Sequence, residues 1–156
     1  IGQGNIRDPH DLRTPLIVAS RWGVVPLVKA LLLRKADVTL QDVQGNSAIA
    51  FAAQYGHCSI VAMLYNAKEG EKMLEVPNSM DLTPLHRATM YGNTETAVFL
   101  LEKGSDMFRS DRVGRNALDY ARLYEHAETV KLLESWAQKL SNTISRGSTK
   151  DVLCTV

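Results

Sequence analysis

The stretch TPLHRATMYGNTETAVFLL, residues 83–101, decides how this chain folds. The Thr83 hydroxyl can accept a hydrogen bond from a free amide at a helix start, and Pro84 suits the first helical position because its missing N–H costs nothing there. Gly92 ends that short helix, since the chain must turn there through a left-handed conformation. A second helix follows, with its apolar stripe at Ala97, Leu100 and Leu101. The stretch therefore predicts two short helices joined by a tight turn.

The same pattern occurs four times along the 156 residues. Its capping position is occupied, at spacings of 33, 36 and 33 residues, by Thr14, Ser47, Thr83 and Asn116. Nine residues after these positions stand Gly23, Gly56, Gly92 and, as an exception, Glu125. Turns rich in aspartate and glycine, such as 42–45 and 111–114, separate the units. Two helices and a turn cannot bury their apolar faces alone, so the units must stack into a one-dimensional array.

The pattern resembles the ankyrin repeat over about residues 11–136, and the third unit, with Thr83-Pro84-Leu85-His86, is the best match. The resemblance implies an all-α fold, an ankyrin-repeat solenoid of stacked helix–turn–helix units joined by β-hairpin-like loops. We expect four repeats at about 11–42, 43–77, 78–110 and 111–136. Residues 1–10 are expected to be the remnant of a preceding repeat or an N-terminal arm. Residues 137–156 are expected to hold the end of the last helix and a flexible C-terminal tail, which we place from Ser141 onward.

Two repeats depart from the family pattern. The second carries three extra residues between Asn66 and Asn78, which we expect to enlarge the loop around 69–72. The fourth replaces the glycine with Glu125, and its second helix carries charged residues that would face water. A polar outer face of this kind is what a terminal capping repeat needs.

The composition narrows the classes of function. A formal net charge of +1 disfavours a dedicated nucleic-acid binder, and the longest apolar runs are too short to span a bilayer. The two cysteines, Cys58 and Cys154, lack the spacing of a disulfide scaffold or a zinc site and suit a reducing compartment. We therefore expect a cytoplasmic protein, with the nucleus as a second location, that is monomeric and not inserted in a membrane.

The potentially reactive side chains suggest structural roles. The resemblance places His57 and His126 in a column where histidine braces the turn, and His86 in the Thr-Pro-Leu-His column, which is also structural. Cys58 adjoins His57, so on a helix the two side chains point about 100° apart and cannot form a catalytic pair. The sequence also lacks a glycine-rich phosphate loop and a set of residues with metal-ligand spacing. We expect no catalytic residues, no metal and no small-molecule cofactor.

A partner protein or peptide is expected in the concave groove that the resemblance implies, where the two residues before each glycine position face the groove. The second residue of each pair is aromatic in every repeat: Trp22, Tyr55, Tyr91 and Tyr124. Such residues anchor many interfaces, although these four could also pack against the neighbouring turn, and the two roles are compatible. With the hairpin tips added, the predicted partner-binding set is Arg21, Trp22, Val43, Gln44, Asn46, Gln54, Tyr55, Met80, Leu82, Met90, Tyr91, Arg112, Arg115, Leu123 and Tyr124.

The hairpin residues also suggest what the partner carries. Exposed Met80 and Leu82 would give the groove an apolar middle, while Arg112 and Arg115, with Arg109, would make one end basic. These arginines could instead form an ordinary solvated charged loop. The pattern favours a partner with an apolar centre and an acidic flank.

Three functional hypotheses stay open. The leading one is a protein–protein interaction scaffold or adaptor, and the second is a regulatory segment of a larger enzyme or channel that contacts its own chain. The third, binding of nucleic acid or a membrane surface through arginines, is disfavoured by the low net charge. The last four residues, 153–156, could in addition serve as a PDZ-domain ligand, although Cys154 stands where that ligand commonly has Ser or Thr.

Overall fold

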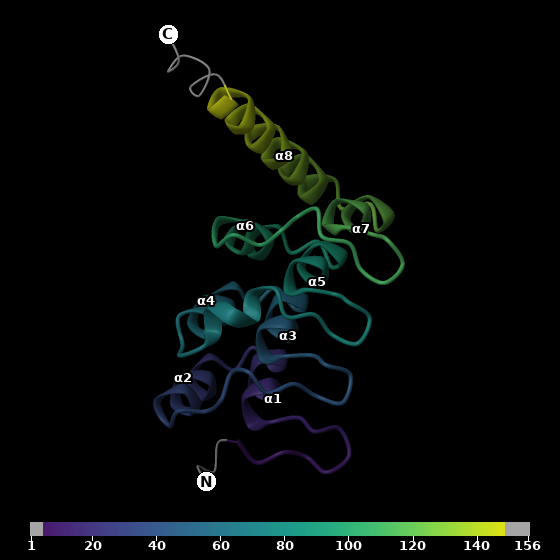
Figure 1. The fold of residues 1–156 in the computed structure, drawn as a ribbon. Helices are drawn as coiled ribbons and strands as arrows, with labels where there is room; N and C mark the ends of the chain where they lie inside the picture. The colour runs from purple at the N-terminus through teal and green to yellow at the C-terminus, as the bar shows by residue number, and fades with distance from the viewer. Residues whose placement is uncertain (1–4, 149–156) are drawn as a thin grey trace.

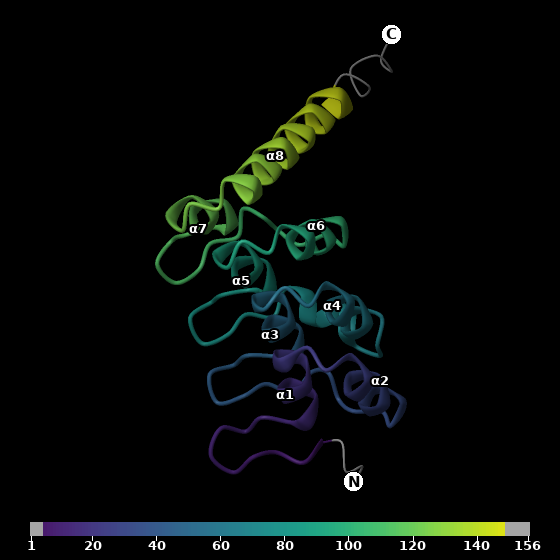
Figure 2. The same cartoon turned by 180° about the vertical axis from the view of Figure 1, so that it is seen from behind.

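The computed structural model describes residues 5–148, whose helices form a stack of pairs (Figure 1). The first helices of the pairs are α1 (Pro15–Trp22), α3 (Ala48–Gln54), α5 (Pro84–Met90) and α7 (Ala117–Leu123). The second helices are α2 (Val25–Leu33), α4 (Cys58–Tyr65), α6 (Thr94–Glu102) and α8 (Ala127–Ser148). Figures 1 and 2 show the first helices in a row beside the hairpin loops, with α2, α4 and α6 on their other side. The expected all-α ankyrin-repeat solenoid is confirmed, and within 5–148 strand pairing is limited to an isolated bridge between Gln41 and Ser47.

Each first helix begins at the residue that the sequence predicts. A side-chain oxygen accepts a hydrogen bond from the amide three residues further on at all four capping positions, Thr14, Ser47, Thr83 and Asn116. The helices end where the backbone turns left-handed, with a φ of 69° at Gly92 and 58° at Glu125. Glu125 therefore adopts the glycine conformation despite its side chain, which is strained for an L-residue.

A side chain from each following repeat braces this turn. His57 Nε2 lies 3.2 Å from the Arg21 carbonyl oxygen, and His126 Nε2 lies 2.9 Å from that of Met90. In the third repeat Asn93 replaces the histidine and donates to two carbonyls of α3, those of Ala53 and Gln54, at 2.9 and 2.7 Å. These contacts support the structural interpretation of His57 and His126.

The hairpin loops also stack on one another. The amide of Val43 donates to the Asp11 carbonyl at 2.9 Å, that of Ser79 to Gln44 at 2.9 Å, and that of Arg112 to Met80 at 3.3 Å. Inside each turn, the first side chain accepts from two amides, as Asp42 does from Gln44 and Asn46. The stack is therefore tied on both sides of the first helices.

The three extra residues of the second repeat form more than an enlarged loop. Residues 70–74 make a short 3-10 helix, η2 (Gly70–Leu74), that packs against α4 and buries Met73 and Leu74. A Cβ on Gly70 would stand 1.9 Å from the Leu64 carbonyl oxygen, so the backbone approach requires glycine there. The insertion thus extends the core as well as the chain.

The prediction of a flexible tail from Ser141 onward is wrong for 141–148, because α8 continues to Ser148. The hydroxyls of Ser141, Thr143 and Ser145 donate to carbonyls three or four residues back, so they find partners inside the helix. Neither proline nor glycine interrupts the segment before Gly147. The proposed PDZ-ligand residues 153–156 lie outside the described residues.

The inter-helix core generates a test of the fold. Leu100 on α6 is completely buried, whereas Leu33, at the end of α2, is 85% exposed. We expect Leu100→Ala to lower the free energy of unfolding by about 2–5 kcal/mol and Leu33→Ala by less than about 0.5 kcal/mol. Urea unfolding followed by circular dichroism measures both, and comparable losses in the two variants would contradict this account of the core.

Candidate partner-binding surface

The four aromatic residues before the turns form one column along the ends of the first helices. Their exposed fractions lie between 43% for Tyr55 and 71% for Trp22, with Tyr91 and Tyr124 at 51%. Exposed aromatic rings at the same position of successive repeats give a continuous row of interface-forming side chains. We call Trp22, Tyr55, Tyr91 and Tyr124 the aromatic column.

The column is also partly packed, as the alternative interpretation allowed. Tyr55 stacks on His57 with ring centroids 6.4 Å apart, and Tyr124 stacks in the same way on His126 and on Tyr120. One side of such a ring rests on the following turn and the rest remains exposed. This arrangement holds the rings in fixed orientations, which lowers the entropy cost of a contact.

Most of the other predicted binding residues are also accessible. Exposed residues are Val43, Gln44, Met80, Arg112, Arg115 and Leu123, and half-buried ones are Arg21, Gln54 and Met90. The hairpin tips that carry Val43, Met80 and Arg112 are adjacent because their backbones are hydrogen bonded in sequence. The structure therefore brings the tips into one row beside the row of first helices (Figure 1).

Two residues of the predicted partner-binding set are buried. Asn46 is 1% exposed because its side chain crosslinks two hairpins: its Nδ2 donates to Asp42 at 3.2 Å, and its Oδ1 accepts from Asn78 at 3.0 Å. Leu82 is 7% exposed, because its backbone closes the turn that starts at Asn78 and its side chain joins the buried set. The apolar middle therefore rests on Met80, without Leu82.

The predicted basic end is also weaker than the sequence suggests. Arg112 pairs with Asp81 at 3.5 Å, and Arg109 pairs with Glu75 at 3.5 Å and donates to its carbonyl at 2.8 Å. Arg115 lies over the Tyr120 ring at 6.0 Å. Two of the three arginine charges at this end are already balanced.

A second group of arginines, which the sequence interpretation missed, lies toward the other end of the first-helix row. The buried ring of Phe51 has three guanidinium carbons around it, those of Arg13, Arg21 and Arg87, at 5.6, 5.8 and 5.5 Å from its centroid. We call these three residues the arginine cluster. The sequence contains a signal for this cluster. Phe51 and Arg87 each stand four residues after the cap of their helix, so they lie on the same helix face as the residues seven and eight positions after that cap.

The cluster is joined to the aromatic column. The Arg21 guanidinium carbon also lies 5.7 Å from the Trp22 ring centroid and 5.9 Å from that of Tyr55. Arg87 donates to the side-chain oxygens of Gln54 and Asn46, which hold its guanidinium between α3 and the hairpin. Arginine and aromatic side chains from three repeats therefore share one surface.

The pKa shifts of Cys58, Tyr120 and Asp111 come from burial and from contacts with neighbouring residues. Burial raises the pKa of the Cys58 thiol, and the nearby Glu95 carboxylate adds to the rise, so the reactive thiolate is disfavoured. Burial and a hydrogen bond to Asp111 raise the pKa of Tyr120 to about 12. Burial acts to raise the pKa of the Asp111 carboxyl, but hydrogen bonds from Tyr120 and two backbone amides lower this pKa overall. These shifts favour the ordinary charge states at neutral pH.

His86 is held in one neutral form. The Thr83 amide donates to its Nδ1 at 3.1 Å, and its Nε2 lies 2.9 Å from the Arg109 carbonyl oxygen, so Nε2 carries the proton. Burial lowers the pKa of this imidazole, against smaller opposing effects of the Arg109 carbonyl and Asp111. The residue closes a capping box and links two repeats, which agrees with the structural role that the resemblance implies.

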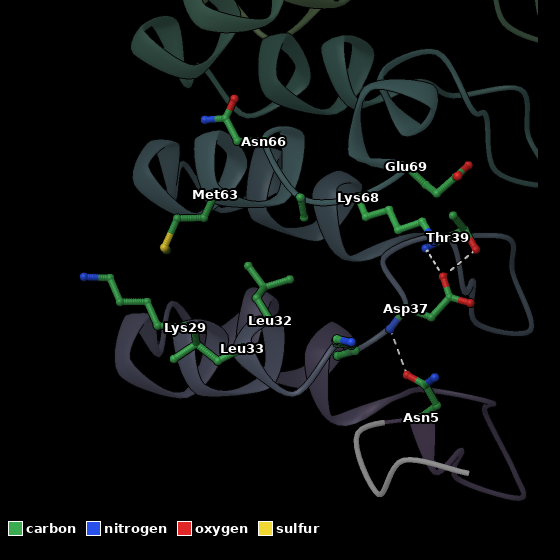
Figure 3. Close-up of a pocket in the computed structure, with 13 residues that line it drawn as sticks. Asn5, Lys29, Leu32, Leu33, Asp37, Thr39, Met63, Asn66, Lys68 and Glu69 are labelled. Carbon is green, nitrogen blue, oxygen red and sulfur yellow. Dashed lines mark hydrogen bonds between the residues drawn. The ribbon is translucent and has the colours of Figure 1, made fainter.

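An open cavity of about 1110 Å³ lies on the second-helix side, between α2 and α4 and the loops after them (Figure 3). Leu32, Leu33 and Met63 contribute apolar surface, and Lys29 and Lys68 contribute charge. At its edge Asn5 accepts a hydrogen bond from the Asp37 amide at 2.8 Å. The sequence interpretation did not predict this cavity, which is formed by residues of two repeats.

Residues 5–148 hold neither a cluster of metal-ligand side chains nor a membrane-spanning helix. In this range no three His, Cys, Asp or Glu side chains gather in a way that could hold a metal ion. Nor does any helix within it combine the length and apolar character needed to cross a bilayer.

Comparison with known proteins adds the relatives. A family model for ankyrin repeats, in three copies, matches residues 2–75 and 71–143. Mouse Rabankyrin-5 is 30% identical over 94% of this chain, Phosphocholine transferase AnkX of Legionella pneumophila is 31% identical over 71%, and human Transient receptor potential cation channel subfamily A member 1 is 29% identical over 81%. The chain spans only 11–12% of the length of these relatives.

The neutral His86 predicts a pH dependence of stability. The pKa of His86 in the folded state is lowered below the unfolded value near 6.5, so the folded state binds fewer protons at this side chain. The contribution of His86 to the free energy of unfolding is therefore complete above that pH and is lost as the pH falls. We expect His86→Asn, which keeps an acceptor for the Thr83 amide, to flatten the loss between pH 7.5 and 5 by up to about 1.4 kcal/mol per unit. Urea unfolding at several pH values measures this, with the exposed His10→Asn as control. Equal slopes for wild type and His86→Asn would contradict it.

Proposed function

The chain belongs to the ankyrin-repeat family, and on this basis we propose that it is a scaffold or adaptor module that binds a partner protein or peptide. The partner lies against the first helices and hairpin tips, and the module itself performs no catalysis. Repeats of this family generally serve protein–protein interaction. Fold alone does not identify a partner, so the proposal rests on the surface of this particular chain.

The observation that carries the proposal is the aromatic column. Four exposed aromatic rings stand at the same position of four repeats, with arginine and methionine side chains beside them. Tyrosine, tryptophan and arginine are the residue types that most often dominate binding energy. Tyr55 and Tyr124 stack on neighbouring histidines, which holds these two rings in fixed orientations without removing their exposed surface.

A second candidate is a regulatory segment that contacts another part of a larger enzyme or channel. It is favoured by the relatives, which include a protein named as a transferase and one named as a cation channel, and of which this chain spans 11–12%. The same surface would then bind a segment of its own chain. A monomeric state and a location in the cytoplasm or nucleus belong to both versions of the proposal.

Affinity capture from cell lysate tests the proposal. The bait is the wild-type chain, compared with a Trp22→Ala/Tyr55→Ala/Tyr91→Ala variant that circular dichroism shows to be folded. We expect the specific partners to be lost with this variant and kept with Leu33→Ala/Phe108→Ala, which removes exposed apolar side chains from α2 and from the loop after α6. Truncating three anchors should weaken binding by well over tenfold, since one interface anchor contributes about 2 kcal/mol or more.

The outcomes separate the candidates. Partners captured equally by the wild type and the aromatic variant would exclude the aromatic column as the binding surface. Capture of segments of a larger protein that contains this chain would favour the regulatory version.

A further inference from the structure

We propose that the arginine cluster receives a carboxylate from the partner, so that the partner is an acidic peptide segment. An Asp or Glu side chain pairs with Arg21 and Arg87, and an apolar neighbour of that residue lies on Trp22 and Tyr55. This inference rests on the proposed function and narrows the class of partner that the surface binds.

The carboxylates near Phe51 do not pair with all three arginines of the cluster. Two carboxylates, those of Asp11 and Asp42, lie near the cluster, and both pair with Arg13, at 3.1 and 3.7 Å. Within residues 5–148, Arg21 and Arg87 form no salt bridge. The acceptors that Arg87 finds, on Gln54 and Asn46, are neutral, and the Arg21 guanidinium donates no hydrogen bond within the same range. Neither Arg21 nor Arg87 therefore has a carboxylate paired with it, and the three arginine charges exceed the two nearby aspartate charges by one.

The three guanidinium groups of the arginine cluster surround one ring. All three guanidinium carbons lie within 5.8 Å of one ring centroid, so no two of them are further apart than twice that distance. Charges at this range repel one another, with partial screening by salt, because the Debye length at physiological ionic strength is about 8 Å. A carboxylate placed between Arg21 and Arg87 relieves this repulsion and accepts hydrogen bonds from their planar donor groups.

The Arg87 side chain is partly buried. Burial lowers the pKa of the Arg87 guanidinium, against the opposing effects of Tyr91, Asp42 and Tyr55, and an arginine stays charged at neutral pH despite such a shift. Its Nε is buried and has no hydrogen-bond partner among the described residues. A positive charge that is partly removed from water is paired more favourably than an exposed one, because the local dielectric constant is lower.

The surroundings favour a peptide carboxylate over a polyanion. The cluster is small, and Asp11 stands at its edge, so a nucleic-acid backbone would meet negative as well as positive charge. Next to it, Trp22 and Tyr55 offer ring surface suited to an apolar side chain. One carboxylate with an apolar neighbour fits both features.

Peptide selection tests the inference. A phage library of random 12-residue peptides is panned against the full 156-residue chain, and selected peptides are measured by fluorescence anisotropy. The variants are Arg21→Gln, whose guanidinium donates no hydrogen bond within residues 5–148 that the substitution could remove, and Arg21→Gln/Arg87→Gln. The control is Lys72→Gln/Arg122→Gln, which removes two exposed cations that are already paired with Glu69 and Glu134. Circular dichroism establishes that each variant is folded.

We expect the selected peptides to share an Asp or Glu beside an apolar residue. Arg21→Gln should weaken their binding about tenfold and the double variant more, while the control should change it less than threefold, since a hydrogen bond to a charged group contributes roughly 1.5–3 kcal/mol. Replacing the shared Glu by Gln in the peptide should cause a similar loss that is not additive with Arg21→Gln.

The opposite results are distinct. Peptides that lack a shared acidic residue but lose binding to the Trp22→Ala/Tyr55→Ala/Tyr91→Ala variant would overturn the carboxylate inference and leave the proposed function standing. Peptides that bind every variant equally would overturn both, and failure to select any peptide would overturn the inference. A phosphoserine version that binds over a hundredfold more tightly than the Glu peptide would assign the cluster to a phosphopeptide instead.

Discussion

The stack depends on one recurring contact, in which a histidine or asparagine of one repeat reaches the carbonyls at the end of the preceding first helix. The contact needs a left-handed turn without a Cβ, since a Cβ on Gly23 would stand 2.6 Å from the His57 ring and one on Gly92 equally close to His126. The aromatic residue that precedes the turn is pushed outward at the same point. The requirement of stacking thus also fixes where the exposed rings appear.

Much of this arrangement could be predicted from the sequence, because it is local. The caps at Thr14 and Asn116, the glycine turns and the burial of Leu100 each follow from a residue type at a fixed position in the repeat. The exposure of Trp22 and Tyr91 also followed, because the family pattern assigns that position to the binding face. The burial of Asn46 did not follow, because it depends on a crosslink to Asn78, 32 residues away in sequence, and the burial of Leu82 accompanies the closure of the turn that starts at Asn78.

The candidate site shows the same division between local and distant effects. Phe51 and Arg87 lie on the predicted face of their helices, so periodicity alone could have found them. Their combination with Arg13 depends on how three repeats align, which a single unit does not reveal. The extension of α8 was missed for another reason: Ser141, Thr143 and Ser145 suggest a flexible segment by composition, yet their hydroxyls bond within the helix. The residues that distinguish this surface are those where the repeats differ from one another.

The ties between repeats are unevenly distributed. Side-chain hydrogen bonds from Asn78, Arg87 and Asn93 join the second and third helix pairs, whereas His57 provides the corresponding tie between the first and second. In a stack where each unit touches only its neighbours, tension applied at the two ends passes undiminished through every junction. The junction beneath α3 relies instead on His57 and on the Arg13–Asp42 ion pair. Under a pulling force we therefore expect the α1–α2 unit to separate from its neighbour before the unit that carries Phe51 separates from the one that carries Arg87.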